Sequence, residues 1–133
     1  MKLKDIKICI DFDGTIVDNF DNPKRVIMPY AFEVMKKLKD AGAYLIFWSL
    51  REGVRLQEAL DFCASNGIVF DSVNEIPIER DYRRSDKTIR RKPDAHHFVD
   101  DRNVGGFIGW DKVEEFLLRS EEHTSELQSR LQI

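Results

Sequence analysis

The sequence contains few of the residues that build zinc sites and disulfide bonds. It has two cysteines among 133 residues, and Cys9 and Cys63 do not show the close spacing of paired metal ligands. Each falls in a predicted strand or helix, where a free cysteine behaves as a small hydrophobic side chain. We therefore expect both in the core of a protein from a reducing compartment, and the cytoplasm is the expected location.

Long hydrophobic runs and an excess of one charge are also missing. No apolar run approaches the roughly 20 residues that span a membrane, and the N-terminus leads into a strand without the apolar core of a signal peptide. The formal net charge is −3, which gives no basis for binding nucleic acid. We expect a soluble globular protein with neither a membrane nor a nucleic acid as partner.

The C-terminal end differs in character from the rest of the chain. The run Arg119-Ser-Glu-Glu-His-Thr-Ser-Glu-Leu-Gln-Ser129 resembles the in-frame translation of a common sequencing-library adapter. The alternative is an ordinary polar helical extension. We favour the adapter, and therefore expect one domain over residues 1–118 and a non-native tail over 119–133 that has no functional role.

Predicted strands alternate with predicted helices along the chain. Strands are expected at 6–12, 43–48, 68–71 and 96–99, with a short fifth at 107–109, and helices at 30–41, 53–66 and 85–91. A last helix is expected to open with a capping box at Asp111 and Glu114 and to run to 118. This order predicts an α/β fold, a doubly wound, Rossmann-like parallel sheet with helices on both faces. Ligands of such sheets bind beyond the carboxyl ends of the strands.

Two carboxylates, two residues apart, end the first predicted strand. In Asp11-Phe12-Asp13-Gly14-Thr15 the chain turns at Gly14, so both acids can converge above the strand end. A bare Asp-x-Asp is usually a solvated strand end, but apolar sequence on both sides holds these two acids near the sheet. Like charges held close together need a metal or a shared proton. The pattern therefore predicts a functional site.

The same five residues resemble the first motif of the haloacid dehalogenase superfamily of phosphotransfer enzymes. The second predicted strand ends on Ser49 and the last on Asp100-Asp101, which resemble the second and fourth motifs, so the likeness spans residues 6–118. It implies a Mg²⁺-dependent phosphatase, that is, a phosphoric monoester hydrolase. No cap domain is expected, because the 38 residues from Asp11 to Ser49 are filled by a loop, a helix and a strand.

The resemblance implies a role for each acid of these motifs. Asp11 would be the nucleophile that forms an aspartyl-phosphate, and Asp13 would be the acid and base. An acid at position 13 resembles the phosphatases, since halide-displacing members lack it. Mg²⁺ would be held by the Asp11 carboxylate, the Asp13 backbone carbonyl and Asp100. Asp101 would act on the metal through water or orient Asp100 and a lysine.

The resemblance also implies a phosphate-binding turn after the second strand. The hydroxyl of Ser49 and the backbone amide of Leu50 would hold phosphate oxygens. For Ser49 considered alone, the alternative is an N-cap for the helix that follows.

The third motif of the family is a Lys or Arg ahead of the last core strand, and the residue that would supply it here stays open. Lys92-Pro93 resembles the Lys-Pro pair often seen in the family. A regular strand before Asp100, however, would place Lys92 at the far end of that strand, more than about 10 Å from the metal. Lys87 would start the helix at 85–91 and lie on the catalytic side. Further candidates are Arg80, Arg83 and Arg84.

The substrate also stays open. A small phosphorylated molecule or a phosphorylated macromolecule would suit an open site. Specificity would come from the loop 18–28, from residues 72–86, or from a neighbouring subunit of a homo-oligomer. The alternative to an enzyme is a catalytically weak or inactive module that binds a phospho-ligand.

Overall fold

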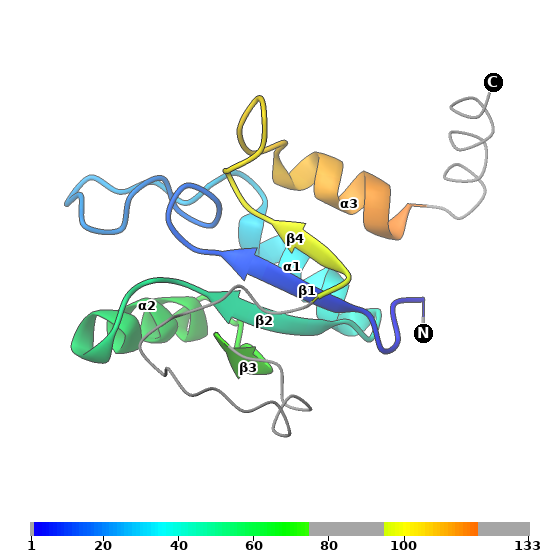
Figure 1. Cartoon of the computed structure of the whole chain (residues 1–133), viewed down its shortest axis with the longest axis horizontal. Coiled ribbons are helices and arrows are strands. Elements are labelled where there is room, and N and C mark those ends of the chain that lie inside the picture. The colour runs from blue at the N-terminus through cyan, green and yellow to red at the C-terminus, as the bar shows by residue number, and fades with distance from the viewer. Residues whose placement is uncertain (1, 75–94, 120–133) are drawn as a thin grey trace, which may run out of the picture.

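The computed structural model describes residues 2–74 and 95–119 (Figure 1). Strands and helices alternate over most of this part of the chain. The elements are β1 (Lys7–Asp11), α1 (Ala31–Asp40), β2 (Tyr44–Trp48), α2 (Gly53–Ser65), β3 (Ser72–Val73), β4 (His97–Val99) and α3 (Trp110–Leu118).

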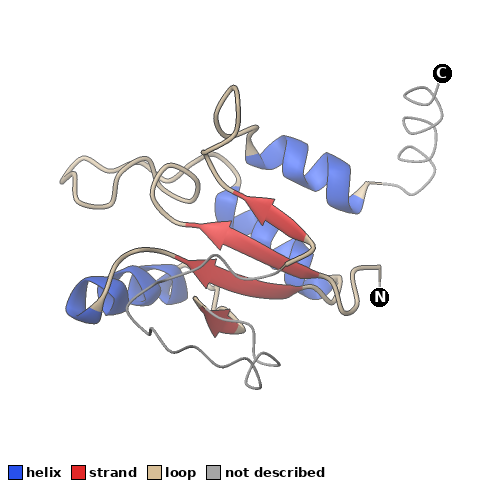
Figure 2. Cartoon of the chain, viewed as in Figure 1, coloured by secondary structure: helices blue, strands red, loops and turns tan. Residues whose placement is uncertain are grey.

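The described strands form one parallel sheet in the order β3-β2-β1-β4 (Figure 2). The central strand β1 pairs Asp11 with Trp48 of β2 and Ile10 with Val99 of β4. The carboxyl ends of β1, β2 and β4 therefore lie at one edge of the sheet. The predicted α/β fold with a parallel sheet flanked by helices is confirmed.

The two faces of the sheet carry separate apolar clusters, because side chains alternate along each strand. On one face Ile8, Ile10, Leu45 and Phe47 join a core that includes buried residues of all three described helices. In Figure 1, α1 lies behind β1 on this side. The other face carries a smaller cluster around Cys9 and Ile46. The helix predicted at 85–91 lies outside the described residues.

Both cysteines lie in the core, as the sequence predicts. Cys9 is 2% exposed and Cys63 is fully buried. Burial raises the pKa of the Cys63 thiol to about 12, because an apolar environment disfavours the thiolate. Cys63 is therefore a packing residue of α2 rather than a reactive thiol.

The third strand begins later than predicted. Residues 68–71 are not a strand: the Ile68 N–H still donates to the Cys63 carbonyl, so the chain there is closing the end of α2. The Leu45 N–H then donates to the side-chain carboxylate of Asp71 at 2.8 Å, instead of to a backbone carbonyl of a paired strand. Pairing with β2 consequently starts at Ser72.

Two expectations near the last helix are also wrong. Residues 107–109 form no strand, and Phe107 instead packs its ring 5.5 Å from that of Trp110. The predicted capping box is absent because α3 starts at Trp110, with Gly109 as its N-cap and no side-chain capping bond. The indole of Trp110 donates to the Thr15 carbonyl at 2.8 Å. Helix α3 is thereby anchored to the turn after β1.

Between β1 and β2 the chain forms a loop and α1, with no added domain. Among the described residues, the helices are too short and too polar to cross a membrane.

Candidate functional site

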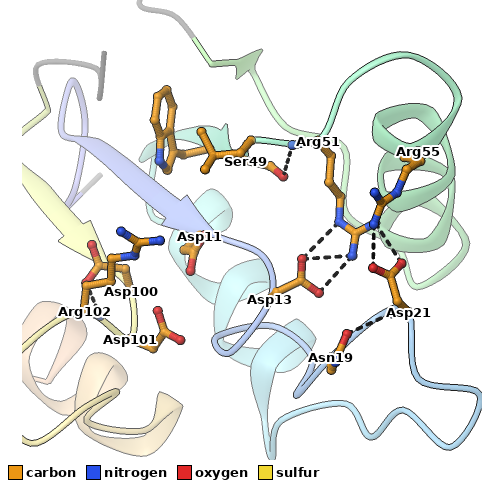
Figure 3. Close-up of a pocket in the computed structure, with 12 residues that line it drawn as sticks. Asp11, Asp13, Asn19, Asp21, Ser49, Arg51, Arg55, Asp100, Asp101 and Arg102 are labelled. Carbon is orange, nitrogen blue, oxygen red and sulfur yellow. Dashed lines mark hydrogen bonds and ion pairs between the residues drawn. The ribbon is translucent and has the colours of Figure 1, made fainter. Parts of the chain in front are cut away.

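An open pocket of about 650 Å³ lies at the carboxyl edge of the sheet (Figure 3). Its walls come from the ends of β1, β2 and β4, from the loop after β1 and from the start of α2. The residues that line it are Asp11, Asp13, Asn19, Asp21, Trp48, Ser49, Leu50, Arg51, Arg55, Asp100, Asp101 and Arg102. Each motif residue predicted from the first, second and fourth motifs therefore lies at this pocket.

A tight turn follows β1, and two residues at its start, Asp11 and Asp13, line the pocket. The Phe12 carbonyl accepts the N–H groups of Thr15, Ile16 and Val17 at 2.9–3.3 Å. Gly14 has a φ of +84°, and a Cβ at this position would overlap the Asp101 carboxylate. Glycine is thus required both by the backbone conformation and by the close approach of Asp101.

Three carboxyl groups gather where β1 and β4 end. Asp11 is partly buried and lies near Asp101, while Asp100 is 6% exposed. Burial is the main cause that raises the pKa of Asp11 to about 6, and the charges of Asp101 and Asp100 add to it. The backbone N–H of Phe12 acts in the opposite direction. Because like charges repel, ionisation of the three carboxyl groups together is disfavoured unless a cation or a proton is bound among them.

Asp13 points to a different partner. Its carboxylate accepts two hydrogen bonds from Arg51, from Nε to Oδ2 at 3.0 Å and from Nη2 to Oδ1 at 3.1 Å. The backbone N–H of Phe20 donates a third, to Oδ1 at 2.9 Å. The two acids of the first motif therefore lie in different surroundings: Asp11 with carboxyl groups, Asp13 with a guanidinium.

Sequence reasoning did not identify Arg51 as a site residue. Its side chain is 7% exposed, lies over the rings of Phe12 and Phe20, and reaches Asp21 at 3.3 Å. A signal was present, because Arg51 follows Ser49 by two residues at the end of a buried strand. The Asp13 side chain comes from a loop whose path the sequence does not reveal, so the pairing was not predictable.

Ser49 is buried in the second turn. It is 5% exposed, and its Oγ accepts the Arg51 N–H at 3.0 Å. Its own N–H donates to Asn74 Oδ1 at 2.8 Å. The N-cap alternative for Ser49 is wrong, because α2 has Glu52 at its N-cap, without a side-chain bond. Leu50 follows at the pocket wall and is 69% exposed.

The loop 18–28, expected to contribute specificity, has a defined structure. Hydrogen bonds from the N–H groups of Val26 and Asn19 lower the pKa of Asp18. Val17 and Ile27 form an antiparallel bridge across its base. The loop delivers Asn19 and Asp21 to the pocket, so it forms part of the rim.

The pocket is lined by more carboxyl groups than guanidinium groups. Five carboxyl groups face three guanidinium groups: Asp11, Asp13, Asp21, Asp100 and Asp101 against Arg51, Arg55 and Arg102. With all groups ionised the balance is −2. Within residues 2–74 and 95–119, no set of three or more carboxyl, imidazole or thiol groups is arranged to enclose a metal. The expected ligand set has two carboxylates and a backbone carbonyl, with phosphate and water completing it, as is common for Mg²⁺.

The third-motif candidates Lys87 and Lys92, together with Arg80, Arg83 and Arg84, lie outside the described residues. The choice among them stays open.

The raised pKa of Asp11 predicts a pH-dependent stability of the metal-free protein. The folded pKa of about 6 lies above the ordinary value of 3.8, so between these values the folded state holds more protons than the unfolded state. The contribution of Asp11 to stability is therefore present below pH 4 and is lost as the pH rises towards 6. Asp11→Asn cannot ionise, and we expect it to gain stability relative to wild type over this range. Urea unfolding in EDTA at several pH values measures this, and a pH-independent difference between the two proteins would contradict it.

Comparison with known proteins gives one informative result. No protein-family model matches the sequence, and none of the curated proteins matches it. The chain is similar to a solved structure described as the conserved protein coded by a locus from Bacteroides thetaiotaomicron, at 38% sequence identity and a TM-score of 0.69. The alignment covers 84% of this chain and 88% of that one. At this identity over most of both lengths, the chain belongs to the same protein family as this conserved Bacteroides thetaiotaomicron protein.

Proposed function

We propose that the protein is a Mg²⁺-dependent phosphoric monoester hydrolase that acts through an aspartyl-phosphate, as the resemblance to the haloacid dehalogenase superfamily implies. The observation that carries the proposal is the separation of two acids in one pocket. Asp11 lies among carboxyl groups, and Asp13 is held by Arg51. A cation bound at the carboxyl cluster would favour the ionised, nucleophilic form of Asp11, and the role of Asp13 as acid and base is the one that the resemblance implies.

In the first step a carboxylate oxygen of Asp11 attacks the phosphorus of the substrate. A bond forms between that oxygen and phosphorus, and the bond from phosphorus to the ester oxygen breaks. Asp13, in its protonated form, gives its proton to the leaving oxygen, so the products of this step are an alcohol and phosphorylated Asp11.

In the second step Asp13, now ionised, takes a proton from a water molecule that attacks the phosphorus of phosphorylated Asp11. The bond between phosphorus and the Asp11 oxygen breaks and releases inorganic phosphate. Both carboxyl groups then have their starting protonation states, and the net reaction is hydrolysis of one phosphate ester by one water.

The resemblance implies a magnesium ion, and the formal balance of −2 and the carboxylate oxygens of the pocket support this proposal. Asp11, Asp100 and the backbone carbonyl of Asp13 would hold the ion, with Asp101 acting through water. When bound, Mg²⁺ neutralises charge on the phosphoryl group. The hydroxyl of Ser49 and the amide of Leu50 would hold phosphate oxygens.

A substrate panel tests the proposal. We expect hydrolysis of an aryl phosphate and of one or more phosphorylated metabolites or phosphopeptides with Mg²⁺, and none with EDTA. The open pocket supports either a small or a macromolecular phosphate ester. If phosphate esters bound with Mg²⁺ but were not hydrolysed, the protein would instead be a module that binds a phospho-ligand.

The third-motif cation carries its own prediction. A lysine beside the phosphoryl group neutralises developing charge, and its loss is expected to reduce kcat by about 10²–10³-fold. We expect this loss in Lys87→Ala, with a small change in Lys92→Ala. Steady-state kinetics of the two variants decides between them. A loss at Lys92 alone would reverse the assignment, and a loss at neither would point to Arg80, Arg83 or Arg84.

A further inference from the structure

We propose that Arg51 is a positioning residue that fixes the Asp13 carboxyl group for proton transfer to the leaving oxygen. This inference rests on the proposed function and extends it. It assigns a role to a residue outside the motifs that the sequence identified.

The contact between Arg51 and Asp13 is a two-point contact. Nε and Nη2 donate to the two different carboxylate oxygens at 3.0 and 3.1 Å, which is the parallel arrangement that fixes the plane of a carboxylate. With the Phe20 N–H on Oδ1 as well, rotation of the Asp13 side chain is restricted. The Asp13 side chain nevertheless remains 40% exposed, so it is held firmly while still open to the pocket.

Arg51 is itself held in place. Its side chain is 7% exposed, and its guanidinium carbon lies 5.6 Å from the centre of the Phe12 ring and 5.2 Å from that of Phe20. Its remaining arm reaches the Asp21 carboxylate, from Nη1 to Oδ1 at 3.3 Å. Figure 3 shows the guanidinium between Asp13 and Asp21. A planar cation on aromatic rings is a rigid support for a carboxylate.

These contacts argue against a second role for Arg51, as a cation that binds substrate phosphate. All three nitrogens of the guanidinium already donate to protein carboxylates. Three of the five guanidinium N–H groups are used in these bonds, and the side chain is 7% exposed, so a substrate phosphate has little access to Arg51. Arg55 differs, because its side chain is 64% exposed and contacts Asp21 alone among the described ion pairs.

The role of Arg51 predicts a dependence on the leaving group. A good leaving group such as nitrophenolate departs without a proton, whereas an alkoxide needs one from Asp13. A displacement of the Asp13 carboxyl group by about 1 Å therefore slows the hydrolysis of alkyl esters more than the hydrolysis of nitrophenyl esters. The informative quantity is the ratio of kcat/KM for a nitrophenyl phosphate to kcat/KM for an alkyl phosphate.

The experiment compares this ratio in wild type, Arg51→Lys, Arg51→Gln and Lys37→Gln. The ratio is independent of the fraction of folded enzyme, so a loss of stability in the Arg51 variants does not affect it. We expect it to rise about 10–10²-fold in both Arg51 variants, because neither side chain reproduces the two-point contact. Lys37→Gln is the control, because Lys37 forms an exposed ion pair with Glu114 and does not line the pocket, and it should leave the ratio unchanged.

The outcomes separate this proposal from the function on which it rests. Equal losses for both esters in the Arg51 variants, or a rise in KM alone, would overturn the positioning role and leave the phosphatase intact. A ratio that rises equally in Lys37→Gln would also overturn it. A wild-type protein that hydrolyses neither ester would overturn the phosphatase, and the role of Arg51 with it.

Discussion

Replacing Asp11 with asparagine is expected to reduce kcat by about 10⁴-fold or more, the largest loss of any single substitution. The amide keeps the size of the side chain but cannot form the acyl-phosphate bond. Asp11 lies at the end of the central strand β1, with carboxyl groups around it. Among the described residues that line the pocket, Ser49 is the one hydroxyl or thiol that could replace it as nucleophile. Ser49 is already tied to the turn by the Arg51 N–H.

The measurement is steady-state hydrolysis of an aryl phosphate in saturating Mg²⁺. Asp61→Asn is a matched control, because Asp61 is an exposed acid on α2 that hydrogen bonds to Gln57 and does not line the pocket. Asp61→Asn should keep wild-type kcat. An Asp11→Asn protein with near wild-type activity would show that the nucleophile is another group.

Asp13→Asn is expected to show the second largest loss, about 10²–10⁴-fold in kcat/KM for an alkyl phosphate. Asparagine keeps an oxygen for Arg51 and for the Phe20 N–H but has no proton to give to the leaving group. The loss should be much smaller for a nitrophenyl phosphate, whose leaving group departs without a proton.

Comparing the two esters in the same preparation of Asp13→Asn provides the check. The loss for the alkyl ester should exceed the loss in Arg51→Lys, because removing the acid costs more than displacing it. Equal losses for the two esters would assign Asp13 to phosphate or metal binding rather than to proton transfer.

The arrangement of the acids was predictable because it depends on backbone topology. Apolar runs that end on Asp11, Ser49 and Asp100 predict parallel strands whose carboxyl ends meet, and the register of Asp11 with Trp48 bears this out. By contrast, the ion pair between Arg51 and Asp13 depends on how the loop after β1 folds back. Loop paths are set by tertiary contacts such as the indole of Trp110 on the Thr15 carbonyl, which no local pattern in the sequence shows.

The errors in element boundaries have a similar origin. Ile68-Val69-Phe70 has the apolar character of a strand, but the chain is still completing the end of α2, and the carboxylate of Asp71 replaces a ladder carbonyl at Leu45. Gly109 likewise ends the apolar run at 107–109 and is the N-cap of α3, two residues before the expected N-cap Asp111. The contact of Asp71 with Leu45 in the first place, and the packing of Phe107 on Trp110 in the second, override the local propensity.

Direct detection of phosphorylated Asp11 tests the central claim most closely. Wild-type protein is mixed with Mg²⁺ and a nitrophenyl phosphate, quenched in acid within the first turnover, and digested for mass spectrometry. We expect a phosphoryl group on the peptide that contains Asp11. Hydroxylamine should remove it, as it removes an acyl-phosphate, and it should be absent from Asp11→Asn. Release of nitrophenol in the first turnover without any phosphoryl group on that peptide would contradict the aspartyl-phosphate mechanism.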